Sequence, residues 1–191
     1  IICKVMERII KDDMMRHMEE HKIIKDSQHG FMNNKSCLTN LLAFFEDTYD
    51  FLDAVPSVDV VYLDFAKAFD KVPHQRLRKK LEAIGIEGKL LEWIGGWLLD
   101  RRQRVAINGM KSKWISVTSG VPQGSVLGPT LFLVYINDLD DGIKSRIYKF
   151  ADDTKLCRAI KTEYDAEVLR DDLRKLYKWS QDWQMLFNVE K

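Results

Sequence analysis

Two acidic segments, far apart in the sequence, carry the residues best suited to chemistry. Asp64 follows the apolar run 58–63, and Asp152 and Asp153 follow residues 146–150, which also have a strand-like pattern. If the two strands lie side by side, the three carboxylates form one cluster. Such a cluster is costly to hold together unless a divalent cation neutralises it. Because two Mg²⁺ ions at such a site can align an in-line phosphoryl displacement, the pattern predicts phosphoryl-transfer chemistry.

Each carboxylate also has a simpler interpretation. Aspartate is common at strand ends, so Asp64 could cap a turn instead of binding metal. Since adjacent strand residues point to opposite faces, only one of Asp152 and Asp153 is expected to be a full ligand, and we favour Asp152. Asp70 lies shortly before Pro73, and we interpret it as a structural residue at a helix start.

A loop rich in glycine and proline is the third candidate element. Residues 119–129 contain three glycines and two prolines immediately before an apolar stretch. Because such a backbone lets a flat or charged ligand approach closely, we expect a ligand site here. Gln123 lies at the apex of the loop and offers a donor and an acceptor to a base edge or a sugar. The alternative is a plain connecting loop.

The composition fits one substantial hydrophobic core. The main clue to binding partners is where the charged residues lie along the sequence. The chain has 191 residues, is 46% hydrophobic and carries a formal net charge of +1, which by itself says nothing about nucleic acid. Basic tracts at residues 71–80 and 101–104 suit a polyanion lying across the acidic cluster. Both tracts could equally be solvated surface.

Three cysteines, Cys3, Cys37 and Cys157, are widely separated and show no metal-type spacing. No disulfide framework is expected, and a reducing intracellular compartment fits best. The sequence has no apolar run near the roughly 20 residues of a membrane span and no secretory signal. Since it begins without Met, we expect a piece of a longer polypeptide.

The periodicity of the chain predicts an α+β fold in which helices pack on a small antiparallel sheet. The strand at 58–63 is apolar at nearly every position, so we expect it to be buried on both faces. The other elements expected are helices at 2–18, 73–84, 89–99, 129–139 and 163–185, a helix capped by Ser36 that ends before Pro56, and hairpins formed by 104–109 with 114–118 and by 146–150 with 154–158.

Taken together and in this order, the motifs resemble the reverse transcriptase of non-LTR retrotransposons, the jockey-like and LINE-type mobile elements. The segments that carry the resemblance are YLDFAKAFDKVPH (62–74), SGVPQGSVLGPTLFLVYINDL (119–139) and FADDTKL (150–156), with QHGFMNNKSCLTNLL (28–42) similar to the fingers of that family and WQMLFNVEK (183–191) similar to the stretch before its primer grip.

The resemblance implies a polymerase palm, a small antiparallel sheet packed on helices, with interleaved helical fingers. Residues 1–57 would form the N-terminal part of the fingers, and 58–75 the first catalytic strand of the palm. Residues 76–118 would form a fingers and palm insertion that contains a hairpin, and 119–191 the rest of the palm. The thumb would be absent from this segment.

The resemblance also assigns roles to the acidic residues. Asp64 and Asp152 would each bind two catalytic Mg²⁺ ions, for which Mn²⁺ could substitute, with Asp153 assisting and the Phe65 main chain completing the metal shell. One ion would lower the pKa of the primer 3′-hydroxyl, and the other would grip the triphosphate of the incoming nucleotide.

The same resemblance implies a nucleotide pocket. Phe69 would stack under the sugar and exclude a ribose 2′-hydroxyl; the alternative is an ordinary core aromatic. Gln123 and Gly124 would line the pocket, and Lys35 would face the nucleotide phosphates. Met32 and Lys35 stand where the family commonly has arginines, and a lysine cannot make the bidentate phosphate contact of an arginine, so nucleotide affinity is expected to be weaker.

The sequence therefore predicts an RNA-directed DNA polymerase that transfers a nucleotide from a dNTP to a primer 3′-hydroxyl and releases pyrophosphate. Its partners would be template RNA, a DNA primer and dNTPs, without a membrane, and its place of action the nucleus and cytoplasm. Another palm polymerase is the neighbouring alternative, although Phe69 argues against an RNA polymerase. The alternative from another class is a catalytically inactive RNA-binding remnant of a degenerate retroelement.

Overall fold

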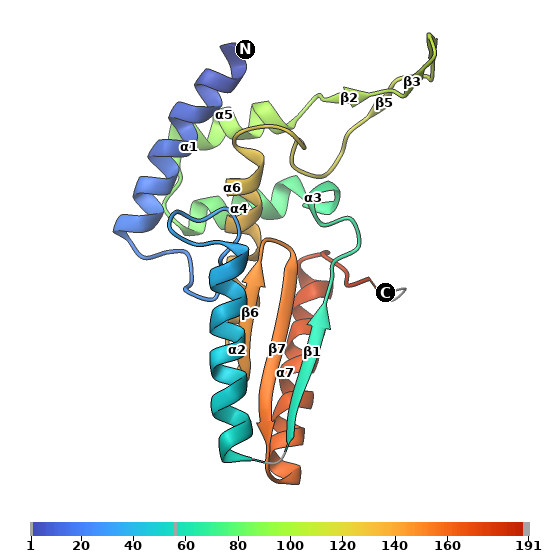
Figure 1. Ribbon diagram of the computed structural model, residues 1–191. Coiled ribbons are helices and arrows are strands. Elements are labelled where there is room, and N and C mark those ends of the chain that lie inside the picture. Colours follow the sequence, from blue (N-terminus) through green and yellow to red (C-terminus); the bar gives the residue numbers. More distant parts are fainter. Residues whose placement is uncertain (1, 56, 189–191) are drawn as a thin grey trace.

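The computed structural model describes residues 2–55 and 57–188, and it has the mixed α+β architecture that the sequence predicts (Figure 1). The elements are helices α1 (Ile2–Glu20), α2 (Cys37–Ala54), α3 (Ala68–Lys71), α4 (His74–Ala83), α5 (Gly88–Leu98), α6 (Gly128–Ile136) and α7 (Glu163–Asp182), the 3-10 helix η1 (Asn137–Asp140), and strands β1 (Ser57–Leu63), β2 (Arg102–Gln103), β3 (Ala106–Ile107), β4 (Met110–Lys111), β5 (Ile115–Ser116), β6 (Arg146–Phe150) and β7 (Asp153–Ile160).

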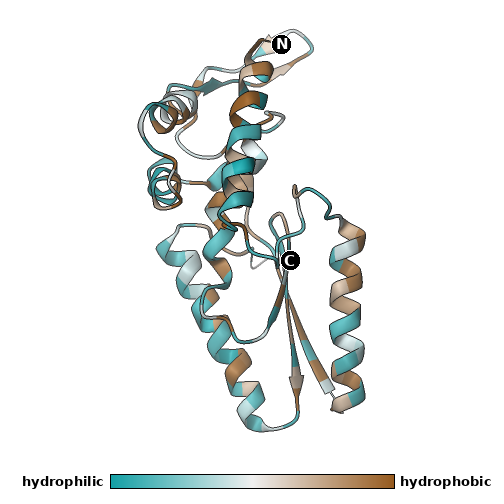
Figure 2. Ribbon diagram, turned by 90° about the vertical axis from the view of Figure 1, so that its left-hand side faces the viewer, coloured by the Kyte–Doolittle hydropathy of each residue, from teal (hydrophilic) through white to brown (hydrophobic). Residues whose placement is uncertain are grey.

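The main sheet is antiparallel, with strand order β1-β7-β6, and a helix covers each of its faces (Figure 2). On the face of α2, Phe44 packs with Tyr148 and Cys157. Leu156, the residue before Cys157, belongs instead to the large core that also contains Leu169 of α7. Because successive strand residues point to opposite faces, one strand serves both layers.

The prediction that the strand at 58–63 is buried on both faces is wrong. β1 lies at the edge of the sheet, and β7 occupies its middle. Tyr62 is 69% exposed, and no residue of β1 is fully buried. The β-branched, apolar sequence of β1 is therefore compatible with a strand that its neighbours cover only in part. Hydrophobicity alone does not show whether a strand lies at the edge or in the middle of a sheet.

The other half of the molecule is built around α6, which lies among α1, α4 and α5 (Figure 1). Every residue of α6 except Pro129 is buried, as expected for a helix that is apolar all round. No described helix is long and apolar enough to cross a membrane.

The helix capped by Ser36 is confirmed. The Ser36 hydroxyl accepts a hydrogen bond from the Thr39 amide at 3.2 Å, and the Thr39 hydroxyl oxygen accepts one from the Ser36 amide at 2.8 Å. This reciprocal arrangement satisfies amides that a helix start leaves without partners.

Both predicted hairpins are present, but one turn lies elsewhere. In the first hairpin the turn falls at Asn108 and Gly109, where φ is +49° and +83°, and not between 109 and 114 as predicted. An Asn-Gly pair readily adopts the two positive φ values of a tight type I′ turn. The second hairpin joins Phe150 to Asp153 through Ala151 and Asp152, so its second strand begins one residue earlier than predicted.

Candidate active site

The end of β1 lies beside the turn between β6 and β7, which brings two of the predicted carboxylates to one place. In the antiparallel register Leu63 pairs with Thr154, so the next residue, Asp64, follows alongside Asp153. Both Asp64 and Asp153 line an open cleft of about 400 Å³. The two acidic segments therefore meet at the same end of the sheet.

Asp152 occupies the turn itself and is not among the described residues that line this cleft. Across the described ranges, no three His, Cys, Asp or Glu side chains form a group that could hold a metal ion. The donor set is nevertheless of the right chemistry, because carboxylate and main-chain oxygens are the ligands that Mg²⁺ prefers. The assignment of Asp64, Asp152, Asp153 and the Phe65 main chain as metal ligands stays a prediction.

Gln28 holds the turn that carries the acidic pair. Its side-chain oxygen accepts hydrogen bonds from the amides of Gly30 and Ala151 at 2.8 and 2.9 Å, and its amide group donates to the Ala151 carbonyl at 3.3 Å. Gln28 is only 2% exposed. Ala151 has a φ of +55°, which is costly for a residue with a side chain. These hydrogen bonds of Gln28, which we call the Gln28 clamp, therefore fix a strained turn immediately before Asp152.

The main chain around Gln28 reinforces this contact. Residues on either side of it pair with Lys149 of β6: the Lys149 amide donates to Ser27 and the His29 amide donates to Lys149, both at 2.8 Å. A side chain at Gly30 would place its Cβ 2.3 Å from the Ala151 nitrogen. The segment around Gln28 is thus an extra strand-like support for the turn that carries Asp152.

Phe65, the residue after Asp64, packs against the C-terminal segment. Its ring stacks on Phe187 with centroids 4.7 Å apart, and it is 3% exposed. The Asn188 amide donates to the Asp64 carbonyl at 2.8 Å, and Phe187 and Asn188 line the same cleft as Asp64. The end of the described chain therefore runs alongside the predicted metal ligands.

Phe69 is packed between two other aromatic side chains. Its ring stacks on Phe132 of α6 with centroids 4.3 Å apart and meets Phe31 edge-on at 6.2 Å. It is only partly buried. This environment fits the core-aromatic alternative, and the role of Phe69 in sugar selection stays a prediction.

The glycine- and proline-rich loop is tied to the short helix α3. The Gln123 side-chain amide donates to the Asp70 carboxylate at 2.9 Å, and the Ser119 hydroxyl donates to the Asp70 carbonyl at 2.8 Å. Gly120 has a φ of +84°, and a Cβ there would lie 2.7 Å from the Asp70 backbone. Asp70 thus acts as a structural anchor that fixes the direction of Gln123, while Gly124 is exposed beside it.

The start of this loop is held by two basic side chains that share one acceptor. His74 Nε2 and an Arg101 amino group donate to the Gly120 carbonyl at 2.9 and 2.7 Å. Burial and the nearby Arg101 charge lower the pKa of His74 below its ordinary value, although the Gly120 carbonyl opposes the shift. His74 is therefore poised to stay neutral near physiological pH.

Lys35 is directed toward its own loop. Its ammonium group donates to the Asp26 carbonyl at 2.7 Å and lies 3.7 Å from the Asp26 carboxylate. Met32 packs against the hydrophobic core. The predicted contact of Lys35 with nucleotide phosphates stays a prediction.

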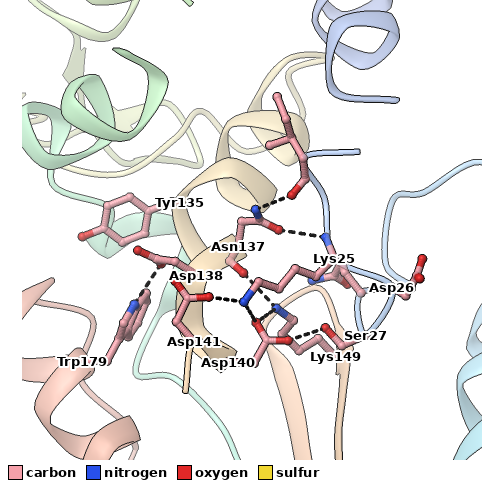
Figure 3. A network of polar contacts seen from close by, with 12 residues as sticks. Lys25, Asp26, Ser27, Tyr135, Asn137, Asp138, Asp140, Asp141, Lys149 and Trp179 are labelled. Atoms are coloured by element: carbon pink, nitrogen blue, oxygen red, sulfur yellow. Dashed lines mark hydrogen bonds and ion pairs between the residues drawn. The ribbon is translucent and has the colours of Figure 1, made fainter. Parts of the chain in front are cut away.

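A polar network around the buried Lys149 was missed by the sequence analysis (Figure 3). Lys149 is fully buried, and its ammonium group lies 2.9 Å from Asp140 of η1 and donates to the Asn137 carbonyl at 3.3 Å. Asp140 also pairs with Lys25 at 3.2 Å and accepts from the Ser27 hydroxyl at 2.7 Å. The network joins the segment from Lys25 to Ser27, strand β6 and helix η1 into one unit.

A second buried lysine extends the network toward α7. Lys80 pairs with Asp138, and its ammonium group lies 3.8 Å from the centroid of Trp183. Burial lowers the pKa of Lys80 to about 8, against the opposing effect of Asp138. The Trp179 indole also donates to Asp138 at 2.9 Å. The only available sequence signal was the group of four polar residues, Asn137, Asp138, Asp140 and Asp141, directly after an apolar helix.

Comparison of the sequence with known families gives a match over the whole chain. The matching family is described as reverse transcriptase (RNA-dependent DNA polymerase), and it covers residues 1–191. The chain is 30% identical over 196 residues to the probable RNA-directed DNA polymerase from transposon X-element of Drosophila melanogaster, covering 100% of this chain and 22% of that protein. It is 28% identical over 197 residues to the RNA-directed DNA polymerase from mobile element jockey of the same species, covering 98% and 21%. The chain thus spans about a fifth of the length of these relatives.

Solved structures with the same fold include yeast telomerases. Apo telomerase from Candida tropicalis, truncated from its C-terminal domain, superposes with a TM-score of 0.68 at 13% identity, covering 99% of this chain and 40% of the other. Telomerase from Candida albicans, in complex with a fragment of telomeric RNA, gives 0.67 at 14% identity, covering 95% and 34%. At such identities the likeness concerns the fold alone.

Proposed function

The chain belongs to the reverse transcriptase (RNA-dependent DNA polymerase) family, and we propose that it is the polymerase segment of a non-LTR retrotransposon that copies an RNA template into DNA. The observation that carries the proposal is the meeting of Asp64 and Asp153 in one cleft at the end of the sheet.

In this proposal Asp64, Asp152, Asp153 and the Phe65 main chain hold two Mg²⁺ ions. When bound, the ions would lower the pKa of the primer 3′-hydroxyl and neutralise charge on the triphosphate. The side chains of the chain itself supply positioning. Gln28 supports the acidic turn through two hydrogen bonds to Ala151, and its side-chain oxygen also accepts one from the Gly30 amide.

The nucleotide would lie between the carboxylate cleft and the loop 119–125. Gln123, oriented by Asp70, would contact the templating pair or the sugar, with Gly124 allowing close approach and Phe69 limiting space at the 2′ position. Lys35 would have to leave Asp26 to reach a phosphate. Template RNA, a DNA primer and dNTPs are the proposed substrates, and nucleus and cytoplasm the proposed place of action.

A catalytically inactive RNA-binding remnant is the second candidate. Met32 packs against the core and Lys35 is engaged with Asp26, so neither residue supplies the arginine charge that the resembled pattern places there. Such a chain would bind RNA without extending a primer.

The test is Mg²⁺-dependent extension of a DNA primer annealed to an RNA template. Asp64→Asn and Asp152→Asn should each lower dNTP incorporation by more than about a hundredfold, since positioned charge carries most of the catalysis of phosphoryl transfer. Asp59→Asn, an exposed change on the same β1 strand, is the matched control and should keep the wild-type rate.

Activity that survives Asp64→Asn would contradict the proposed site. Absence of incorporation by the wild-type chain, together with RNA binding that is unchanged in Asp64→Asn, would favour the inactive remnant.

A further inference from the structure

The hairpin of β2 to β5 forms an arm, residues 102–116, that leaves the body of the molecule (Figure 1). Its strands pair only with one another, β2 with β5 and β3 with β4. Every residue from 102 to 116 is exposed. A projection of this kind contributes little to the core, so its side chains are available for a partner.

The arm carries uncompensated positive charge. It contains four basic residues, Arg102, Arg104, Lys111 and Lys113, and no acidic residue. None of the four forms an ion pair with any residue that the structure describes. By contrast, Arg170 and Arg174 on α7 each pair with two carboxylates. A free cluster of one sign attracts a polyanion.

An exposed indole lies within this charge. Trp114 is 53% exposed, and the guanidinium carbons of Arg104 and Arg102 lie 4.4 and 5.8 Å from its ring centroid. In the antiparallel register Gln103 pairs with Ile115, so the next positions outward, Arg104 and Trp114, lie opposite each other. Arg102 is two residues before Arg104 and therefore points to the same face. Aromatic rings beside arginines are the platforms on which unpaired bases stack.

The arm also exposes apolar side chains, Ile107 and Met110 among them, at 65% and 77%. These could instead contact another protein. Two features favour nucleic acid over a protein partner. The arm has basic residues and no acidic residue, which suits phosphates, and the indole of Trp114 between arginines suits a base.

We propose that the arm binds single-stranded nucleic acid outside the carboxylate cleft, with phosphates on its arginines and lysines and one base on Trp114. Only a single strand can offer an unpaired base to an indole of this kind. RNA and DNA share the required chemistry. The inference goes beyond the proposed polymerase, because binding by the arm requires neither metal nor nucleotide.

The first experiment measures fluorescence anisotropy of labelled oligo(rU), oligo(dT) and a DNA duplex with the 191-residue chain over a range of salt concentrations. The variant Arg102→Ser/Arg104→Ser is compared with Arg170→Ser/Arg174→Ser, which removes the same charge from α7. We expect the arm variant to bind single strands about tenfold more weakly and its salt slope to fall by about 1.4, since each lost phosphate contact contributes about 0.7. The α7 variant should bind as the wild type does.

The second experiment separates stacking from apolar docking. Trp114→Leu keeps an apolar side chain but loses the ring, so it should weaken single-strand binding about tenfold, whereas Trp114→Phe should retain most of the affinity. Neither change should affect the duplex. Losses on both oligo(rU) and oligo(dT), or on one of them, support the proposal and identify the preferred strand.

Three results would overturn it: no single-strand binding by the wild type, equal affinities of the arm and α7 variants, or a Trp114→Leu protein that binds as the wild type does. If the arm variants change only the sedimentation of the protein in the absence of nucleic acid, the arm is a protein-docking surface.

Discussion

The side chain of Gln28 bonds both main-chain groups of Ala151, 123 positions later in the sequence. This single contact links a segment near the N-terminus to the turn that presents Asp152 and Asp153. Because the backbone of Ala151 has a positive φ, the turn depends on outside support to keep its conformation.

Replacement of Gln28 by Met should lower both stability and activity. The change leaves the buried amides of Gly30 and Ala151 without an acceptor, and each unsatisfied buried group costs about 1–3 kcal/mol. We expect a loss of about 2 kcal/mol or more in urea unfolding. Gln75→Met, an exposed change on α4, should be nearly neutral. If Gln28→Met unfolds at the wild-type midpoint, the clamp has no energetic importance.

The buried pair of Lys149 and Asp140 should behave as one unit. Lys149→Met leaves Asp140 partly unpaired in the interior, and breaking one side of a buried pair typically costs about 3–5 kcal/mol. Asp140→Asn likewise leaves the buried Lys149 charge without its partner carboxylate. The double variant should therefore be less destabilised than the sum of the two single variants, by about 1 kcal/mol or more. Strict additivity in urea unfolding would show that the two groups are not coupled.

The same pair predicts a dependence on acid. Burial alone would raise the pKa of Asp140, but Lys149, Ser27 and Lys25 together hold it below its ordinary value of 3.8. A lowered carboxyl pKa stabilises the fold above pH 3.8, and this contribution is lost as the pH falls through the folded-state pKa. The wild type should thus lose more stability than Asp140→Asn between pH 5 and about pH 3. Parallel stability curves would contradict the assigned shift.

The sequence predicted the strands that carry the acidic residues better than the contacts that support them. Short-range periodicity located β1, β6 and β7, and the motifs made Asp64, Asp152 and Asp153 candidates without any information about register. Gln28 lies in a turn-rich loop, and its partner is remote, so no local pattern could reveal the clamp. Lys149 was equally hidden, because a lysine is almost never fully buried without a partner and that partner, Asp140, belongs to a different element.

His74 should make stability sensitive to mild acid. Its folded-state pKa lies below the ordinary 6.5 because of burial and the Arg101 charge. The unfolded chain therefore takes up a proton first as the pH falls below 6.5, and the contribution of His74 to stability is lost as the pH falls through the folded-state pKa.

His74→Gln keeps a donor for the Gly120 carbonyl but cannot titrate. Because His29 also has a lowered pKa, the informative quantity is the difference in stability between the wild type and His74→Gln. Between pH 7 and about pH 5 the wild type should lose more stability than His74→Gln does. His21→Gln, at an exposed position directly after α1, is the control. A difference that is constant with pH would refute the role of His74.

The contact between Asp70 and Gln123 can show whether Asp70 orients the loop or binds metal. Asp70→Asn retains an oxygen that can accept from the Gln123 amide, whereas Asp70→Ala removes it. If Asp70 only positions Gln123, Asp70→Asn should polymerise at a rate near the wild type. Asp70→Ala should raise KM for dNTP about 3- to 10-fold with a smaller change in kcat, as expected for loss of one hydrogen bond. Gln123→Ala combined with Asp70→Ala should add little further. Loss of activity in Asp70→Asn as complete as in Asp64→Asn would instead make Asp70 a metal ligand, because an amide can replace a hydrogen-bond acceptor but not the charge of a carboxylate.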